Sequence, residues 1–388
     1  MLLRIMVIVM AGMMLYAQSP VPEGAEVEEV AGGFSFIEGP VWLTDGFLLF
    51  SDINANKVYK WSEGGGVEVY LDPSGQSNGL AVDAAGNLLL AQHAKRRIAK
   101  LDVNGVETNL VNRYDGKLLN SPNDLVVKSD GAIYFTDPPY GGNPSELGFS
   151  GIFRFSPEGD LVLLDASLSR PNGIAFSPDQ TKLYVNDSEA RRIYIWDIQS
   201  DGTIKNKKLF YFMNENGNAD GMKVDTNGNL YSAGPGGIWI FKPDGTLLDR
   251  IAVLGQTTNC NWGESDHKTL YITSANTMYR IRLNATGIIT DRRQSLHQRM
   301  PDTFELYENY PNPFNATTRI SFYLPRAKQV KLTIFNILGQ KIDVIASGYL
   351  AAGTHAFTWQ ADHQPSGIYY YSLVAEGERL TRPMVLVK

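Results

Sequence analysis

The segment Asn78–Leu88 reads NGLAVDAAGNL, and it decides the fold because variants of it recur along the chain. Each copy has a leading polar residue, an apolar run, a turn rich in Asp, Asn or Gly, and a second apolar run. That order predicts two antiparallel strands joined by a tight turn. The copies begin at Glu38, Asn78, Asn123, Asn172, Asp220 and Asn259, with spacings of 40, 45, 49, 48 and 39 residues.

A third, alternating segment follows each copy, for example KVYKW at residues 57–61 and RIYIW at residues 192–196. Alternation of apolar and polar residues is typical of a half-buried strand. Repeats of this length with three or four strands each predict an all-β, six-bladed β-propeller. Residues 27–34 precede the first repeat and are placed to complete the last blade. A linear solenoid or a β-sandwich is the alternative.

Composition narrows the function. The chain has 388 residues and a net charge of −6, which gives no reason to expect nucleic acid or an anionic membrane as a partner. Its single cysteine, Cys260, excludes an intramolecular disulfide and a Cys-rich zinc site, and five histidines make a multi-His site improbable. Oxygen ligands remain plentiful, and they select hard cations. We expect a monomer.

The N-terminus has the features of a secretory signal. Arg4 supplies a positive charge, residues 5–15 are apolar, and Ala17 provides a small residue for cleavage. Residues 1–17 are therefore predicted to be a signal peptide, and the mature protein to be exported. An uncleaved membrane anchor is the alternative, although the apolar run is short for a full span.

The leading polar residues of the repeats carry the predicted chemistry. The first strand of each propeller blade lines the central channel, so equivalent positions converge there. Carboxylates and amides all offer oxygen, which suits Ca²⁺ or a similar divalent ion. Such an ion polarises a carbonyl or phosphoryl oxygen and lowers the pKa of bound water. Asp220 is then the candidate general base. The alternatives are that these residues only form turns and that Asp220 is only a ligand.

Longer motifs surround these positions. LNSPNDLVVKSDG at residues 119–131 leads into FTDPPYG at residues 135–141, and EGPVW (38–42), RPNG (170–173) and ADGM (219–222) complete the set. With these motifs, residues 25–290 resemble the gluconolactonase branch of the senescence-marker-protein (regucalcin)/gluconolactonase family. The resemblance implies one catalytic divalent cation, most readily Ca²⁺ and otherwise Zn²⁺, Mn²⁺ or Mg²⁺, and hydrolysis of sugar lactones.

The same resemblance implies roles for single residues. Glu38, Asn172 and Asp220 would be metal ligands, and Asn123 a ligand or the amide that orients the substrate. We expect substrate contacts from Asn123, Asn78, His93 and Asn259, and a structural role is the alternative for His93. Members of this branch carry an acidic residue before that histidine, whereas this chain has Gln92. The Gly- and Pro-rich segment 138–150 is a candidate lid.

The repeat pattern ends near residue 292, and a different pattern begins at residue 304. Strand-like runs between turn signals predict a small Ig-like β-sandwich at residues 304–388. YPNPFN (310–315), ILGQ (337–340), SGIY (366–369) and MVLVK (384–388) resemble the sorting domain of type IX secretion substrates. This implies passage across the outer membrane and a secreted or cell-surface location. A carbohydrate-binding or adhesive module is the alternative.

The predicted organisation is a signal peptide (1–17), a propeller (24–292), a linker (293–303) and a sorting domain (304–388). The predicted partners are a small lactone and the type IX secretion machinery. The predicted function is metal-dependent opening of sugar lactones by water. The alternatives are hydrolysis of phosphotriesters or other lactones at the same metal, and a non-enzymatic calcium-binding propeller.

Overall fold

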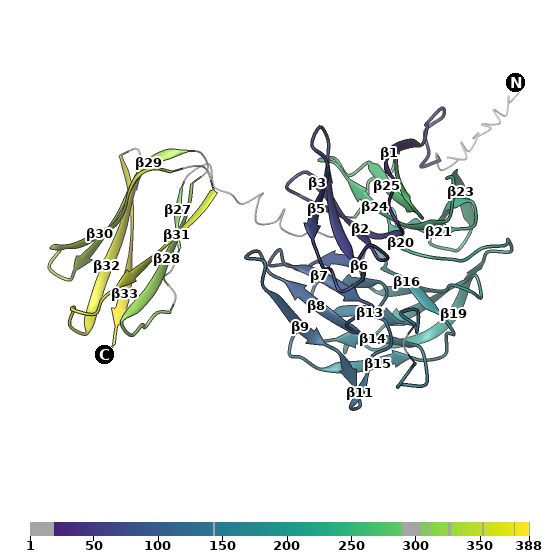
Figure 1. Ribbon diagram of the computed structural model, residues 1–388, viewed down its shortest axis with the longest axis horizontal. Coiled ribbons are helices and arrows are strands. Elements are labelled where there is room, and N and C mark those ends of the chain that lie inside the picture. Colours follow the sequence, from purple (N-terminus) through teal and green to yellow (C-terminus); the bar gives the residue numbers. More distant parts are fainter. Residues whose placement is uncertain are drawn as a thin grey trace, which may run out of the picture. The chain divides into compact units, whose positions relative to one another are not determined.

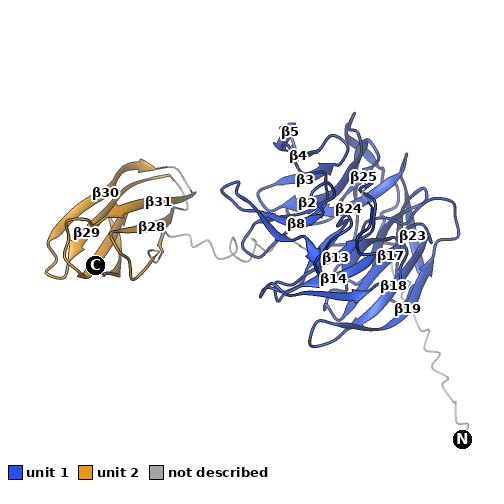
Figure 2. Ribbon diagram, turned by 60° about the horizontal axis from the view of Figure 1, so that its bottom comes forward, with its two compact units in different colours: residues 1–294 blue, residues 295–388 orange. Residues whose placement is uncertain are grey.

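The computed structural model describes residues 19–288, except 143, and residues 304–387, except 308, 310, 325, 326, 351, 352 and 376. The chain divides into two compact units, residues 1–294 and residues 295–388 (Figure 2). The predicted signal peptide and the predicted linker lie outside the described residues. No helix in the described part of the chain has the length and apolar character needed to cross a membrane.

The first unit is a β-propeller. Within residues 19–288 the strands form six four-stranded antiparallel sheets, and each sheet is one blade (Figure 1). The predicted fold is confirmed, and the fourth strand of each blade is now defined.

The strands of each blade run from the channel outward. Blades 1 and 2 comprise β2 (Ile37–Leu43), β3 (Phe47–Asp52), β4 (Lys57–Ser62) and β5 (Gly66–Leu71), then β6 (Ser77–Val82), β7 (Leu88–Gln92), β8 (Arg97–Leu101) and β9 (Glu107–Val111). Blades 3 and 4 comprise β12 (Leu125–Val127), β13 (Ile133–Asp137), β14 (Gly151–Phe155) and β15 (Leu161–Asp165), then β16 (Pro171–Phe176), β17 (Lys182–Asp187), β18 (Arg192–Ile198) and β19 (Ile204–Phe212). Blades 5 and 6 comprise β20 (Met222–Val224), β21 (Leu230–Gly234), β22 (Gly237–Phe241) and β23 (Leu247–Ala252), then β24 (Thr257–Gly263), β25 (Thr269–Ser274), β26 (Thr277–Arg282) and β1 (Glu28–Gly32). A short hairpin, β10 (Arg113–Tyr114) and β11 (Lys117–Leu118), links blades 2 and 3.

The N-terminal strand closes the ring. β1 pairs antiparallel with β26, with Glu28 opposite Arg280 and Gly32 opposite Thr277, so the last blade takes its outer strand from the start of the chain. At the same junction, Trp42 of blade 1 stacks on Tyr271 of blade 6, with ring centroids 5.4 Å apart. This pairing covers the outer edge of β26, which would otherwise be free.

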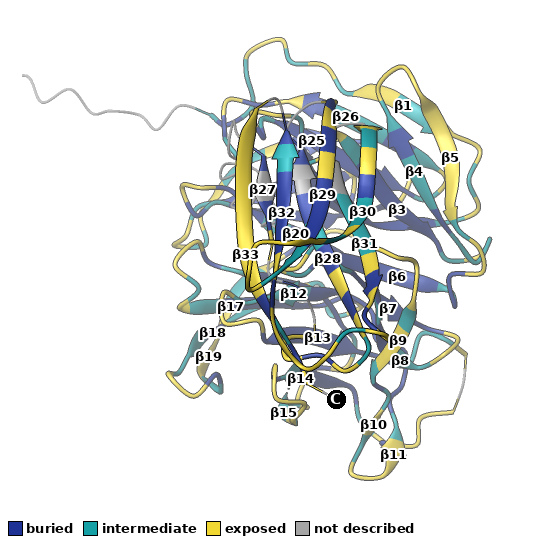
Figure 3. Ribbon diagram, turned by 90° about the vertical axis from the view of Figure 1, so that its left-hand side faces the viewer, coloured by how far each residue is buried: buried dark blue, intermediate teal, exposed yellow. Residues whose placement is uncertain are grey.

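Burial follows the radial position of each strand. The inner strands β2, β6 and β24 are buried along their whole length. The outer strand β5, in contrast, is mostly exposed, as a comparison with β6 in Figure 3 shows. Apolar side chains of neighbouring blades share clusters. One cluster joins Leu90 of blade 2 to Val41 of blade 1, and another joins Ala175 of blade 4 to Trp239 of blade 5. Burial of these side chains between the sheets holds the blades in a ring.

Bulges turn the predicted ring residues toward the channel. The pairing register of the inner strand shifts just beyond Glu38 in β2, just beyond Ser77 in β6 and just beyond Pro171 in β16. A bulge bends its strand and redirects the side chains at that point. The glycine after the ring residue permits close packing: a Cβ on Gly173 would lie 2.3 Å from the carbonyl oxygen of Asp220 in the next blade.

The second unit is a β-sandwich with its own core. One sheet has the order β27-β28-β31 and the other the order β30-β29-β32-β33. Ile320, Leu332, Trp359 and Tyr371 are among the side chains buried between them. The strands are β27 (Glu305–Leu306), β28 (Thr317–Leu324), β29 (Lys328–Asn336), β30 (Lys341–Leu350), β31 (Gly353–Gln360), β32 (Gly367–Ala375) and β33 (Glu378–Leu386).

Candidate active site

A polar cavity of about 240 Å³ opens at the end of the channel where the inner strands begin. Blades 1 to 5 contribute residues at or near the start of their inner strands. Blade 6 contributes only Gln256, which directly precedes its inner strand β24. The lining residues are Phe36, Glu38, Ile53, Asn54, Asn78, His93, Asn123, Tyr140, Asn172, Ser188, Asn218, Asp220 and Gln256. Of the predicted site residues, therefore, all but Asn259 line this cavity.

Two carboxyl groups, those of Glu38 and Asp220, face each other in the cavity. Their residues are only 3% and 6% exposed, and the charge of each carboxyl group acts on the other. Burial, together with the charge of Asp124, raises the pKa of Glu38 to about 7. Burial and the neighbouring Glu38 raise the pKa of Asp220 well above its ordinary value. Without a cation between them, the two groups repel each other as anions and favour holding a proton.

Asn259 lies beneath the cavity. Its amide nitrogen donates to Oε2 of Glu38 at 3.1 Å and lies 3.5 Å from Oδ2 of Asp124. Its amide oxygen accepts from the backbone N–H of Cys260 at 2.9 Å. The structure thus places Asn259 under the floor, as a support for Glu38.

Two charged residues that sequence reasoning missed share this floor. Asp124 is 2% exposed, and it occupies the position that Gly79, Gly173 and Gly221 occupy after their ring residues. Lys223 projects from β20, and its ammonium lies 3.4 Å from the amide oxygen of Asn259. An Asp where four of the other five repeats have Gly was a visible signal. Nothing in the repeat pattern marked Lys223.

His93 stands on the blade 2 side of the cavity. Its Nε2 lies 3.4 Å from the amide nitrogen of Asn78, so it accepts a hydrogen bond there. Burial lowers the pKa of His93 to about 4, which keeps the ring neutral near pH 7. Both residues can therefore offer polar contacts to a neutral, hydroxyl-rich ligand.

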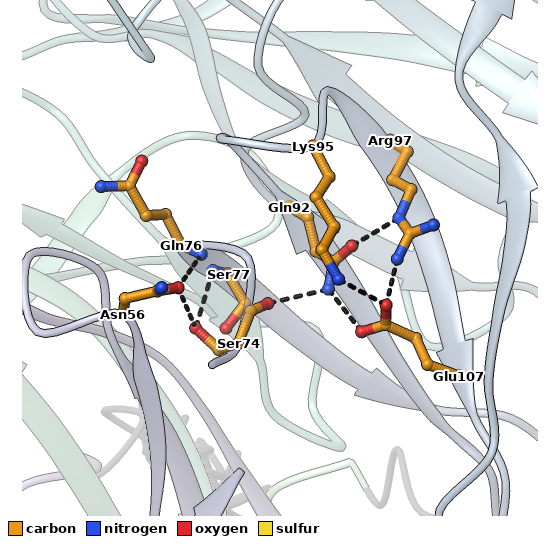
Figure 4. A network of polar contacts seen from close by, with 8 residues as sticks. All are labelled: Asn56, Ser74, Gln76, Ser77, Gln92, Lys95, Arg97 and Glu107. Atoms are coloured by element: carbon orange, nitrogen blue, oxygen red, sulfur yellow. Dashed lines mark hydrogen bonds and ion pairs between the residues drawn. The ribbon is translucent and has the colours of Figure 1, made fainter. Parts of the chain in front are cut away.

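Gln92 anchors the turn that carries His93. Its amide nitrogen donates to the carbonyl of Ser74 and to Glu107, each at 2.8 Å, and its oxygen accepts from Arg97 at 2.6 Å (Figure 4). Lys95 and Arg97 also pair with Glu107. In blades 1, 3 and 4 the equivalent residue is an Asp that accepts backbone N–H groups of the loop entering its own blade. The unexpected glutamine is thus part of a different anchoring network.

Tyr140, in the segment between β13 and β14, was not predicted as a site residue. Its hydroxyl lies near the side chains of Ser188 and Asn172, and burial raises its pKa to about 12. The segment is fixed at several points: Gly141 donates to Ser121 at 2.7 Å, and Glu146 accepts from Arg96 at 3.0 Å and from the backbone of Leu118 at 3.0 Å. This part of the candidate lid forms a wall of the cavity.

The cavity fits a divalent cation. Oδ1 of Asp220 is buried without a hydrogen-bond partner, and two carboxylates and several amides converge near it. Within the described residues, no group of three or more His, Cys, Asp or Glu side chains is placed to hold a metal ion. The candidate site does not form such a group because most of its donors are amide oxygens, and only two are carboxylates. Such oxygen-only sets suit hard cations.

Comparison with known proteins places this geometry in a family. The family model described as "SMP-30/Gluconolactonase/LRE-like region" matches residues 36–276. The chain belongs to this family. It is 40% identical over 293 residues to the gluconolactonase of Zymomonas mobilis, an alignment that covers 67% of this chain and 82% of that relative. It is 27% identical over 247 residues to a pentonolactonase of Haloferax volcanii, covering 61% and 81%.

Solved structures in this family agree. A gluconolactonase from Xanthomonas campestris is 35% identical, with a TM-score of 0.63, and the match covers 67% of this chain and 89% of that protein. A second family model, described as "Secretion system C-terminal sorting domain", matches residues 308–387. Both predicted resemblances are thereby confirmed, and the C-terminal sandwich is a secretion sorting domain.

Proposed function

We propose that the propeller hydrolyses sugar lactones with one divalent cation held by Glu38, Asn123, Asn172 and Asp220. The chain is a lactone hydrolase of its family, and the 40% identity to a gluconolactonase carries that conclusion. The ligand set, the cation and the sugar are our proposal. Supporting it are the cavity that these side chains line and the unpartnered oxygen of Asp220.

The reaction requires one proton to be moved. The oxygen of a water molecule adds to the lactone carbonyl carbon, and Asp220 accepts the proton that this water loses. The ring C–O bond then breaks, and its oxygen takes up the proton held by Asp220 to give the open hydroxy acid. A bound divalent cation supplies Lewis acidity for the carbonyl oxygen. Burial of Asp220 away from bulk water strengthens its interaction with the attacking water.

Neutral side chains around the carboxylates would hold the sugar. Asn78, His93 and Tyr140 offer donors and acceptors on the cavity wall, and none of them carries a charge near neutral pH. A polyhydroxylated lactone presents hydroxyl groups on several sides, so dispersed neutral contacts suit it. Asn123, next to the cation position, is placed either to ligate or to orient the substrate carbonyl.

We further propose export by a signal peptide followed by type IX secretion. The sorting-domain match at residues 308–387 supports delivery to the cell surface or the medium. The secretion machinery is then the partner of the C-terminal sandwich, and the lactone is the partner of the propeller.

Proton release from D-glucono-1,5-lactone tests the proposed reaction. The purified protein is stripped of metal and resupplied with Ca²⁺, Zn²⁺, Mn²⁺ or Mg²⁺. We expect turnover only with metal, and a fall in kcat of roughly 10²–10⁴-fold in Asp220→Asn, which keeps the shape of the side chain but removes the base. Asp83→Asn, which changes a turn of blade 2 away from the cavity, is the matched control.

Two outcomes would redirect the proposal. Metal binding without turnover of gluconolactone would exclude that substrate, and a phosphotriester or another lactone would be assayed next on the same protein. Metal binding without turnover of any ester would favour a calcium-binding propeller without catalysis. Full activity after metal removal would overturn the cation site itself.

A further inference from the structure

A second cavity, of about 90 Å³, lies in the channel below the floor of the site. Its wall is mostly aliphatic, with residues such as Leu80, Val126 and Ala175. Among the described residues that line it, Lys223 alone is charged. A lysine stem can lie along apolar surface, but its ammonium needs polar partners.

The polar partners of the Lys223 ammonium lie at the floor of the polar cavity. It donates to the carbonyl of Met222 at 3.0 Å and lies 3.4 Å from Oδ1 of Asn259. Because that oxygen also accepts from the backbone of Cys260, the amide nitrogen of Asn259 must face Glu38 and Asp124. Lys223 and the backbone of Cys260 thus fix the orientation of the Asn259 amide, so that its nitrogen faces the two carboxylates.

Lys223 also acts on Asp124 through its charge. Asn259 lies between the two charges: its amide oxygen is 3.4 Å from the ammonium of Lys223, and its amide nitrogen is 3.5 Å from Oδ2 of Asp124. Asp124 is 2% exposed, so without a nearby cation its ionised form would be costly. Backbone N–H groups and Asn259 supply the remaining stabilisation.

The charges at the floor can be counted from these contacts. Glu38, Asp124 and Asp220 are three carboxylates within one buried cluster, and they act on each other electrostatically. Lys223 supplies one positive charge to that cluster. With all three carboxylates ionised, two negative charges remain uncompensated, which is the charge that one divalent cation balances.

We propose that Lys223 is a positioning residue that acts as the built-in counterion of the channel, neutralising Asp124 from below so that the site holds a single divalent cation. This inference rests on the proposed metal site. It predicts that affinity for the cation follows the net charge of the floor. Loss of the ammonium makes the floor more negative and removes its repulsion toward the incoming ion, and loss of Asp124 has the opposite effect.

Calorimetric titration of the metal-stripped protein with Ca²⁺ at pH 8 tests the inference. We expect Lys223→Met to bind Ca²⁺ about tenfold more tightly than wild type, and Asp124→Asn about tenfold more weakly. The double variant removes one charge of each sign, so its affinity should return to within about threefold of wild type. Lys182→Met, which removes an ion pair with Asp197 on blade 4, is the control and should leave the affinity unchanged.

The double variant separates a charge effect from a packing effect. If Lys223 only supported the packing of the floor, both single variants would bind Ca²⁺ more weakly and the double variant most weakly, which would overturn the inference. Should Lys223→Met fail to fold, Asp124→Asn and the double variant still decide the sign. A wild-type protein that binds neither Ca²⁺ nor Mn²⁺ would overturn the proposed metal site and this inference with it. Binding by wild type with the wrong pattern among the variants would overturn the inference alone.

Discussion

At the scale of single residues, Tyr140 tests whether the cavity wall contacts the substrate. Its hydroxyl lies near Ser188 and Asn172, and its ring lies near Arg170, 5.6 Å from the guanidinium carbon. Tyr140→Phe keeps the ring and removes one donor. We expect kcat/KM for gluconolactone to fall roughly 3- to 10-fold, the value of one hydrogen bond, with little change in melting temperature. An unchanged kcat/KM would mean that Tyr140 only shapes the wall.

His93 gives a prediction about pH. Its pKa is lowered to about 4 by burial, whereas an unfolded histidine titrates near 6.5. The unfolded state therefore binds more protons between these values, so the contribution of His93 to stability is complete above pH 6.5 and is lost as the pH falls toward 4. Urea unfolding at pH 7 and pH 5 should show wild type losing about 2 kcal/mol more than His93→Gln over that interval. Equal losses would show that His93 is not buried in its neutral form.

The repeat pattern identified the site residues that occupy equivalent positions in the blades. It did not identify the site residues that lie outside that pattern. Glu38 and Asp220 were identified because their strands repeat in phase, and a common position in a blade means a common position at the channel. The repeat pattern does not show how deep in the channel each side chain lies. Asn259 was therefore expected to contact substrate, but it lies under the floor of the cavity, where it binds Glu38. Lys223 was missed because its side-chain partner, Asn259, belongs to the next blade, and no local pattern reports a contact between blades.

At the scale of elements, blade 2 uses a different anchor from blades 1, 3 and 4: Gln92 stands where those blades have an Asp. Glu107 begins β9 and accepts from Gln92, Lys95 and Arg97, and it thereby ties the outer strand to the turn that bears His93 (Figure 4). Glu107→Ala should lower the free energy of unfolding by about 1–3 kcal/mol, because Gln92 and Arg97 lose a charged partner away from bulk solvent.

The control for that change lies in blade 1. Glu68 pairs with Lys60 at 2.6 Å, but its side chain is 64% exposed, so Glu68→Ala should change the free energy of unfolding by less than about 1 kcal/mol. Thermal and urea unfolding of both variants make the comparison. Equal effects would mean that the Glu107 network contributes no more than an ordinary surface ion pair.

The elements themselves were largely predictable, and the exceptions have a physical reason. Inner strands are buried on both faces and alternate with strong turn signals, so their pattern stands out in the sequence. The outer strands pack on one side only. β5, for example, reads GVEVYL and is mostly exposed, so its apolar residues do not mark a buried face. In the sandwich, β30 gives an equally weak signal, because half-buried and exposed residues alternate irregularly along it.

At the scale of the whole molecule, the two units have separate cores. The buried cluster of the sandwich consists of residues 304–386, whereas every cluster of the propeller draws on residues 21–288. The strands that close each unit also come from within it: β1 completes blade 6, and β33 pairs with β32. Each unit therefore has the core and the closed pairing that independent folding requires.

That separation predicts the effect of removing the sorting domain. A chain ending at residue 294 should fold, and its kcat/KM for gluconolactone should stay within about twofold of the full chain, because all residues lining the cavity belong to the propeller. The full chain should show two calorimetric transitions, of which the truncated chain keeps one at an unchanged temperature, since domains with separate cores unfold independently. A chain lacking residues 19–32 is the opposite control: it loses β1, leaves β26 with an unpaired edge, and should unfold at a lower temperature. A truncated propeller that lost activity while keeping its transition would show that the sandwich contributes to the site, which the contents of the cavity and of the two cores argue against.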